Sequence, residues 1–322
     1  MIPPPAMARS LARSRVLLAG DLILDEYRQG TALGLSAETP TLVACDQTTS
    51  FSLGGAGLLC RNLLALGGQV LFVTLLGDDH YERHALEFRH PRLTKLFLRE
   101  TGRKTTVKSR FWVSGYKLLQ WDRLDNRPLQ PRTQKALLAA VRRHLPACDK
   151  LVISDYRHGL LDQSLAQALV RLARQLGKPV YVDSQVSQSA ANHRWYAGAT
   201  LFCLNRREAL AVDPQFEAQP LEAALRRLRA SLDAQSLILK LGAEGCRALV
   251  DSRTRDFAPP RVEVADTTGA GDAFFAVLAL APSPPGEAHL RLANTWAALS
   301  TTLLGAQPPT LEMLQRIPAR RR

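Results

Sequence analysis

Near its carboxyl end the chain reads Asp266-Thr-Thr-Gly-Ala-Gly-Asp272-Ala-Phe-Phe275, and this stretch decides more about the fold and the chemistry than any other. The small residues 269–271 allow a tight turn that presents consecutive backbone N–H groups. The apolar run 273–280 predicts a helix, and the N-terminus of a helix binds anions through its unpaired N–H groups and its dipole. A carboxylate there repels phosphate, so Asp272 is best explained as a base for an attacking hydroxyl. The stretch therefore predicts a kinase.

The same stretch also has a simpler interpretation. A glycine pair before an apolar helix is typical of a turn with an N-cap, and Asp272 would then only interact with the helix dipole. The ten-residue string as a whole is more specific than its central four residues. The strand-like segment 262–265 before it also favours the active-site interpretation.

Length and composition limit the class of protein. With 322 residues the chain can form one large α/β domain or two domains. A hydrophobic content of 46% with 22% charged residues is ordinary for a globular protein. The net charge of +13 invites a nucleic-acid hypothesis, but apart from the short runs 13–15 and 320–322 the basic residues are dispersed. An anionic small substrate or simply a basic solvated surface explains the charge equally well, and we do not expect a nucleic acid as partner.

The cysteines and the apolar runs indicate the compartment. The five cysteines are scattered, without a C-x-x-C pair, at positions Cys45, Cys60, Cys148, Cys203 and Cys246. This pattern favours reduced, mostly buried thiols over a disulfide framework or a zinc site. Asp21 interrupts the first apolar run too early for a signal sequence, and no run approaches the roughly 20 residues of a membrane span. We expect a cytoplasmic protein without a membrane partner.

Short apolar runs alternate with amphipathic ones along the chain. Buried strands are predicted at residues 16–19, 70–75, 151–154, 180–182, 201–204 and 237–240. Helices are predicted at residues 55–66, 162–176, 206–212 and 221–232, and a short final helix after Pro308. Strands that alternate with helices imply right-handed crossovers and a mainly parallel sheet covered on both faces.

Two segments depart from this alternation. Residues 27–52 and 103–125 lack helical periodicity and are rich in β-branched and aromatic residues, and Ser114-Gly115 is a hairpin signal. These segments can pair into a small separate sheet over the strand ends, which would form a lid. Their exposed strand edges also favour a homodimer through the lid.

Two motifs, Gly54-Gly-Ala-Gly-Leu58 and the stretch 266–275, resemble the ribokinase-like (pfkB-type) sugar kinases over residues 15–305. Finer matches resemble the bacterial D-glycero-β-D-manno-heptose-7-phosphate kinases of ADP-heptose synthesis. They are Gly20-Asp-Leu-Ile-Leu-Asp25-Glu-Tyr27, Leu35-Ser-Ala-Glu-Thr-Pro40, Ser154-Asp-Tyr-Arg-His-Gly159 and Tyr196-Ala-Gly-Ala-Thr200. The resemblance implies an α/β three-layer sandwich with a β-sheet lid.

The resemblance also implies an organisation along the chain. We expect a flexible segment at 1–14, one kinase domain at 15–318 and a basic tail at 319–322. The nucleotidyltransferase domain of the fused two-domain form is not expected, and the kinase would stand alone.

On the nucleotide side, the resemblance assigns the catalytic base to Asp272 and the anion hole to Gly269, Ala270 and Gly271. It implies ATP and Mg²⁺ as cofactors, with Asn205 and Glu208 organising the metal through water. The same pair equally fits a capping box at a helix start. Further nucleotide contacts are implied for Lys240, Gly242, Gly245, Thr268 and Asn294.

On the acceptor side, acidic residues and glycines after predicted strands would bind the sugar. They are Asp21, Asp25, Gly54, Gly55 and Asp155. Basic residues suited to a substrate phosphate are Lys104, Arg157 and His158. On their own, the acids are equally explained as turn residues and the cations as surface charge.

Three positions depart from the family pattern. Leu58 stands where the family has a sugar-contacting Asn, and Asp183-Ser184-Gln185 replaces Asp-Pro-Lys, which removes a cation. The usual Thr before the nucleotide-side turn is replaced by Lys240. The expected reaction is therefore ATP-dependent phosphorylation of a sugar or sugar phosphate, with heptose 7-phosphate converted to heptose 1,7-bisphosphate. The alternatives are a kinase for another sugar or a nucleoside, and a degenerate member that binds a ligand as a regulator.

Overall fold

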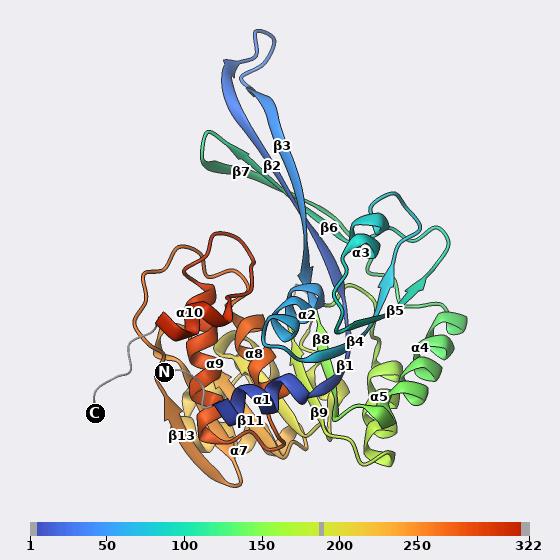
Figure 1. Ribbon diagram of the computed structural model, residues 1–322, viewed down its shortest axis with the longest axis vertical. Helices are drawn as coiled ribbons and strands as arrows, with labels where there is room; N and C mark the ends of the chain where they lie inside the picture. Colours follow the sequence, from blue (N-terminus) through green and yellow to red (C-terminus); the bar gives the residue numbers. More distant parts are fainter. Residues whose placement is uncertain (1–4, 187–189, 317–322) are drawn as a thin grey trace.

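The computed structural model describes residues 5–186 and 190–316, and within them a nine-stranded sheet forms the centre of the fold (Figure 1). The strand order is β13-β12-β11-β10-β9-β8-β1-β4-β5. The strands are β1 (Arg15–Gly20), β4 (Gln69–Leu76), β5 (Leu93–Arg99), β8 (Lys150–Asp155), β9 (Val180–Ser184), β10 (Leu201–Asn205), β11 (Ser236–Lys240), β12 (Cys246–Val250) and β13 (Arg253–Phe257). Pairing is parallel from β5 to β11, and β12 and β13 follow as antiparallel strands. All six predicted strands are confirmed.

Helices cover both faces of this sheet. They are α1 (Pro5–Arg13), α2 (Ala56–Ala65), α3 (Glu82–Glu87), α4 (Pro131–His144), α5 (Gln163–Gln175), α6 (Arg206–Val212), α7 (Leu221–Ser231), α8 (Ala270–Leu280), α9 (Glu287–Ser300) and α10 (Leu311–Arg316). Successive strand residues face opposite sides, so Leu18 joins a core with α2, α8 and α9, and Leu17 joins a core with α4, α5 and α7. The predicted three-layer α/β sandwich and its helices are confirmed.

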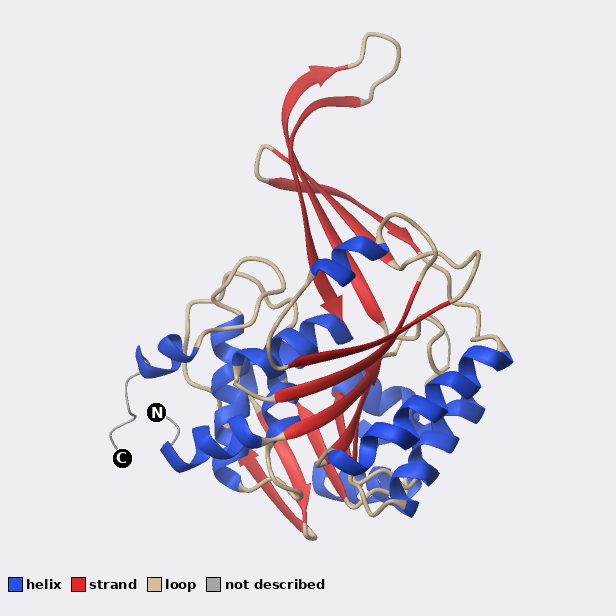
Figure 2. Ribbon diagram, turned by 45° about the vertical axis from the view of Figure 1, so that its right-hand side comes forward, coloured by secondary structure: helices blue, strands red, loops and turns tan. Residues whose placement is uncertain are grey.

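The two segments that lack helical periodicity pair into a second, four-stranded sheet. Its strands are β2 (Leu22–Leu35), β3 (Leu42–Gly55), β6 (Val107–Val113) and β7 (Tyr116–Arg123), in the order β3-β2-β6-β7. Ser114 and Gly115 form the predicted hairpin turn, with φ angles of 50° and 84°. This sheet, the lid, rises away from the large sheet, and the β2–β3 ribbon extends beyond β6 and β7 (Figures 1 and 2).

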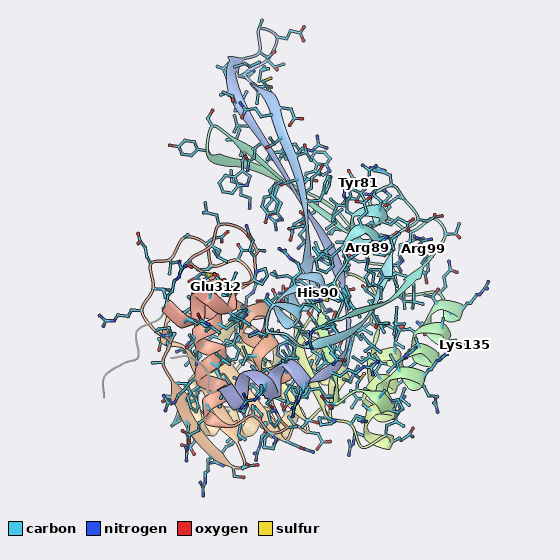
Figure 3. All side chains as sticks on the ribbon, viewed as in Figure 1. Tyr81, Arg89, His90, Arg99, Lys135 and Glu312 are labelled. Carbon is cyan, nitrogen blue, oxygen red and sulfur yellow. The ribbon has the colours of Figure 1, made fainter. Side chains whose placement is uncertain are left out.

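The outer face of the lid is fixed at its base by aromatic and ionic contacts. The Tyr81 ring, labelled in Figure 3, lies edge-on to the Phe51 ring with a centroid distance of 6.3 Å. The Arg123 guanidinium lies 5.4 Å from the Tyr81 ring centroid and bonds Asp79 at 3.0 Å. The residues nearest the large sheet are therefore held, whereas residues 32–35 and 37–50 are exposed.

One expectation about the amino terminus and one about the motif are corrected, and the expectation about the carboxyl terminus is not tested. Residues 5–13 form helix α1, whose Leu11 is buried in the core, so this part of the chain is not a flexible segment. The basic tail 319–322 lies outside the described residues. Residues 262–265 are not a strand, and they run as a loop that is tied to α9 by the Ala265 N–H donating to the Thr301 carbonyl.

The cysteines follow the expectation from composition. Cys60, Cys148, Cys203 and Cys246 are buried free thiols, and Cys45 is exposed on the lid. Among the described residues, no helix combines the length and the apolar character that a membrane crossing requires.

Candidate active site

A cavity of about 1050 Å³ lies between the carboxyl ends of the central strands and the lid. The strand ends contribute Asp183, Asn205 and Lys240, and the lid contributes Asp25 and Arg110. Most of the predicted site residues line this one cavity, namely Asp25, Gly55, Asn205, Glu208, Lys240, Gly242, Gly245, Thr268, Gly269, Ala270, Gly271, Asp272 and Asn294. Parallel strands bring these distant segments to one edge of the sheet, where α/β proteins bind ligands.

The turn at the start of α8 has the geometry that its sequence requires. Gly269 is the N-cap residue with a φ of 81°, and a Cβ atom there would lie 2.5 Å from the Leu58 Cδ2 atom. The Asp266 carboxylate holds the turn, because its Oδ1 accepts from the Thr268 N–H at 2.9 Å and its Oδ2 from the Gly305 N–H at 3.1 Å. The turn therefore points the helix N-terminus into the cavity, as an anion site requires.

Asp272 occupies the first turn of this helix and is half-buried. The Tyr156 hydroxyl donates to both of its carboxylate oxygens, at 2.7 and 2.8 Å. Burial raises the pKa of Asp272 to about 7; the Tyr156 hydrogen bond lowers it, Asp183 raises it and Lys240 lowers it. A carboxyl that titrates near neutral pH at an anion site is suited to general-base chemistry.

Asn205 and Glu208 form a capping box, which is one of the two interpretations that the sequence allows for this pair. The Glu208 N–H donates to the Asn205 Oδ1 atom at 2.9 Å, and the Asn205 N–H donates to the Glu208 Oε2 atom at 2.8 Å. Both side chains also line the cavity. Burial is the main cause that raises the pKa of Glu208 to about 7. The capping role is confirmed, and it holds both side chains at the cavity wall.

The side chains of Asn205 and Glu208 could hold a metal ion only if water or substrate supplied its remaining ligands. In the part of the chain that the structure describes, no three His, Cys, Asp or Glu side chains are grouped so that they could hold a metal ion. Magnesium usually keeps several waters and binds through one or two carboxylates together with substrate phosphates. Asn205 and Glu208 offer an amide and a carboxylate at the cavity wall, which agrees with contact through water.

Lys240 lies beside the anion turn. Its Nζ atom donates to the Asp183 Oδ2 atom at 2.8 Å, and it lies 3.6 Å from where a Cβ atom on Gly271 would be. Burial opposes the lysine charge, but the neighbouring Asp183, Cys203 and Glu208 outweigh it and raise the pKa of Lys240 well above its usual value. The cation that replaces the family's Thr is therefore held charged next to the turn at the start of α8.

Asp21 and Asp155 are not placed at the cavity, in contrast to the prediction. The Asp21 carboxylate is buried and accepts backbone N–H groups of the loop that follows β8. The Asp155 Oδ2 atom accepts from the Tyr196 hydroxyl and the Asn192 amide, both at 2.6 Å. Because interior partners occupy them, these carboxylates shape the loops around the site rather than face an acceptor.

The predicted phosphate-binding cations also lie elsewhere. Lys104 lines a separate small crevice that also contains Asp125. The Arg157 Nη1 atom donates to the Ala190 carbonyl, and His158 Nδ1 lies 3.0 Å from the Asn126 Oδ1 atom. None of the three lines the main cavity.

Two further predicted residues act within the protein interior. A Cβ atom on Gly54 would lie 2.0 Å from the Asp25 Oδ2 atom, so this glycine makes room for Asp25. The Asn294 amide donates to the Phe257 and Leu290 carbonyls, although Asn294 also lines the cavity. Gly54 therefore makes room for Asp25 without lining the cavity itself.

Lys108 and Arg110 of β6 are cavity residues that the sequence reasoning missed. Arg110 forms an ion pair with Asp25, and its guanidinium lies 5.4 Å from the Tyr27 ring centroid. Arg110 also borders a second chamber of about 730 Å³ under the lid, together with Arg61. The available signal was the spacing of two, since alternate residues of a strand share one face.

Comparison with known proteins agrees with this arrangement. Residues 17–313 match the profile of the pfkB family carbohydrate kinases. The chain belongs to this family. It is 33% identical over 307 residues to the bifunctional protein HldE of Paramagnetospirillum magneticum, and 34% identical over 307 residues to that of Acidiphilium cryptum. These alignments include 92% and 93% of this chain but only 61% and 62% of the relatives' own length.

Solved structures support the fold of this pfkB-family kinase. Phosphofructokinase-2 from Escherichia coli superposes with a TM-score of 0.77 at 18% identity, covering 95% of this chain and 97% of the other. Ribokinase from Arabidopsis thaliana superposes with a TM-score of 0.69, also at 18% identity, covering 95% and 100%. The ribokinase-like fold is therefore shared across the whole described domain.

Proposed function

We propose that this carbohydrate kinase transfers the γ-phosphoryl group of ATP to a hydroxyl of a sugar phosphate. The first acceptor to test is heptose 7-phosphate, which would give heptose 1,7-bisphosphate in the synthesis of ADP-heptose for lipopolysaccharide. The observation that carries the proposal is that one cavity contains a near-neutral carboxyl, an anion turn and two lid cations. The similarity to proteins named HldE supports the choice of the first acceptor.

In this proposal Asp272 accepts the proton of the attacking hydroxyl. The backbone of Gly269, Ala270 and Gly271 binds the transferred phosphoryl group, and Lys240 beside it adds positive charge. Phosphoryl transfer needs little covalent work from the protein, so alignment and charge stabilisation supply most of the acceleration. A bound Mg²⁺ would neutralise the ATP phosphates, and Asn205 and Glu208 would hold it through water.

The acceptor would enter under the lid. Asp25 can accept hydroxyl hydrogen bonds, and Gly55 leaves space beside it, because both line the cavity. The acceptor's phosphate would bind to Lys108 and Arg110 instead of the lysine that Gln185 replaces. Gly242, Gly245, Thr268 and Asn294 remain the proposed nucleotide contacts.

We include a cytoplasmic homodimer in the proposal. The lid exposes large apolar side chains, among them Leu35, Tyr116 and Trp121 with exposed fractions of 72%, 75% and 67%. An exposed apolar strand surface favours association, and a pair of lids that cover each other would protect it. Sedimentation at micromolar concentration measures the oligomeric state directly.

An acceptor panel with an ADP-release assay tests the function. We expect the highest kcat/KM with heptose 7-phosphate, lower values with sugar phosphates of other lengths, and the lowest with free sugars and nucleosides. Turnover of other acceptors but not of heptose 7-phosphate would overturn the assignment of the acceptor. Ligand binding without turnover of any acceptor would instead favour the regulator.

A further inference from the structure

The loop after β8 is held from behind by a buried carboxylate. Asp21 accepts three backbone N–H groups from this loop, those of Tyr156 at 2.9 Å, His158 at 3.2 Å and Leu160 at 3.1 Å. Arg157 and Gly159 adopt φ angles of 65° and 90°, which turn the loop back so that alternate N–H groups reach one side chain. This anchoring fixes the backbone of Tyr156 close to the floor of the cavity.

From this fixed loop the Tyr156 side chain reaches Asp272, which is 116 residues away in the sequence. Its hydroxyl donates to both carboxylate oxygens of Asp272, at 2.7 and 2.8 Å. Burial and the neighbouring Asp272 raise the pKa of Tyr156 well above its usual value, so the phenol stays a neutral donor. Tyr156 is therefore hydrogen-bonded through its backbone N–H to Asp21 and through its hydroxyl to Asp272.

We propose that Tyr156 is the positioning residue of the catalytic base: its hydroxyl holds the Asp272 carboxylate in one orientation, and Asp21 fixes the loop that carries it. This inference rests on the proposed function, because Asp272 is a base only if the protein transfers a phosphoryl group to a hydroxyl. The motif that contains Asp272 predicts neither the positioning role of Tyr156 nor the supporting role of Asp21.

The chemistry of a carboxylate allows this contact during turnover. An ionised carboxyl has about four lone-pair sites, so Asp272 can accept from Tyr156 and from the acceptor hydroxyl together. As the acceptor oxygen bonds to phosphorus and the bond from phosphorus to ADP breaks, the hydroxyl proton passes to Asp272. Tyr156 keeps its own proton throughout, because it is a far weaker acid than the carboxyl.

Three other charged groups face Asp272 and set the background for its titration. Asp183 from β9 and Asp25 from β2 raise its pKa, and Lys240 from β11 lowers it. Burial raises the pKa further, and the Tyr156 hydroxyl opposes it by bonding to the charged form. Removing that hydroxyl therefore raises the pKa of Asp272, so a base that must be ionised loses activity at a higher pH than in the unchanged enzyme.

The first test is the Tyr156→Phe variant of the full chain. We expect the acid limb of the kcat/KM profile to move to higher pH by about one unit, since hydrogen bonds to charged groups are among the stronger ones. Above the new limb kcat recovers to within about tenfold of the original, because Asp272 itself is still present. The matched control is Tyr181→Phe, whose hydroxyl lies 3.4 Å from the Pro282 carbonyl and away from the cavity. Superposable pH profiles for Tyr156→Phe and the unchanged enzyme would overturn the proposal.

A second readout separates this inference from the proposed function. In protein labelled with ¹³C at the aspartate carboxyl groups, the Asp272 signal is assigned by its loss in Asp272→Asn, and its titration needs no substrate. We expect it to titrate at higher pH in Tyr156→Phe, and an unchanged titration would refute the positioning role whether or not any acceptor is turned over. Absence of turnover in the unchanged enzyme, with the titration shift present, would refute only the proposed function.

A further variant covers the case in which Tyr156→Phe does not fold. Genetically encoded 3-fluorotyrosine at position 156 keeps the ring and the hydroxyl and makes the hydroxyl a stronger donor. We expect the Asp272 titration to move to lower pH, opposite to the shift from phenylalanine. A shift in the same direction or no shift would contradict the hydrogen bond as the cause.

Discussion

The anion turn at 267–272 is built from one continuous stretch of chain, whereas the acceptor side of the same cavity is assembled from the lid strands and the loop after β8. In the turn, local geometry decides the residue, since Gly269 needs a positive φ and has no room for a Cβ atom. On the acceptor side, Asp25 and Arg110 meet only because β2 and β6 pair in the lid. The residues proposed for the reaction therefore come from one local segment of the sequence, whereas those proposed for acceptor binding are brought together by tertiary contacts.

The largest effect is expected on the local side, from Asp272→Asn. The change keeps the size and removes the base, so kcat should fall by about 10²–10⁴-fold while nucleotide affinity stays nearly unchanged. Steady-state kinetics together with calorimetric nucleotide titration measure both quantities. The control is Asp256→Asn on β13, which changes an exposed ion pair outside the cavity. Near-normal turnover in Asp272→Asn would contradict the role of this carboxylate.

An intermediate effect is expected on the assembled side, from Arg110→Met. Loss of a charge-assisted contact with the acceptor's phosphate should raise the acceptor KM by about 10- to 100-fold and leave the nucleotide KM within about twofold. Arg28→Met is the matched control, because Arg28 is also a lid arginine in an ion pair, with Glu26, but does not line the cavity. Equal effects of the two variants on the acceptor KM would show that Arg110 acts through the lid's structure alone.

The smallest effect on acceptor binding is expected from Asp21→Asn. Asparagine has one acceptor oxygen in place of two, so at least one buried N–H group of the loop after β8 loses its partner and the free energy of unfolding falls by about 1–3 kcal/mol. The acceptor KM should stay within about threefold, since Asp21 does not line the cavity. Chemical denaturation and steady-state kinetics check the two parts. A large rise in the acceptor KM with unchanged stability would restore Asp21 as a substrate ligand.

Much of the fold follows from the sequence because its signals are local. Strands β1, β4, β8, β9, β10 and β11 are buried on both faces of the sheet. Strands of this kind are continuous apolar runs, and such runs can be recognised in the sequence. Helix α1 was missed, because its basic and alanine-rich sequence resembles a leader, while its contribution to the core depends on Leu11 meeting α8 and its neighbours. The loop 262–265 was predicted as a strand because alternating valines resemble one, although it pairs with no other strand of the described chain.

The site divides in the same way. The turn and the capping box at Asn205 follow from short local motifs, whereas the position of Lys240 follows only from the resemblance to the family. Asp21 and Asp155 carry the residue type of a sugar ligand, but burial gives their oxygens to the protein's own donors. Lys104 and Lys108 are only four residues apart. Lys108 belongs to β6, which begins at Val107, and lines the cavity, whereas Lys104 precedes the strand and lines a separate crevice. Sequence spacing alone does not show which side of such a boundary a residue occupies.

The most direct measurement is a crystal structure of the Asp272→Asn variant with ATP, Mg²⁺ and the best acceptor from the panel. We expect the γ-phosphate against the backbone of 269–271, the acceptor hydroxyl beside residue 272 near Tyr156, and the acceptor's phosphate on Lys108 and Arg110. An acceptor phosphate bound instead by Lys104, Arg157 or His158, with its hydroxyl away from residue 272, would contradict it.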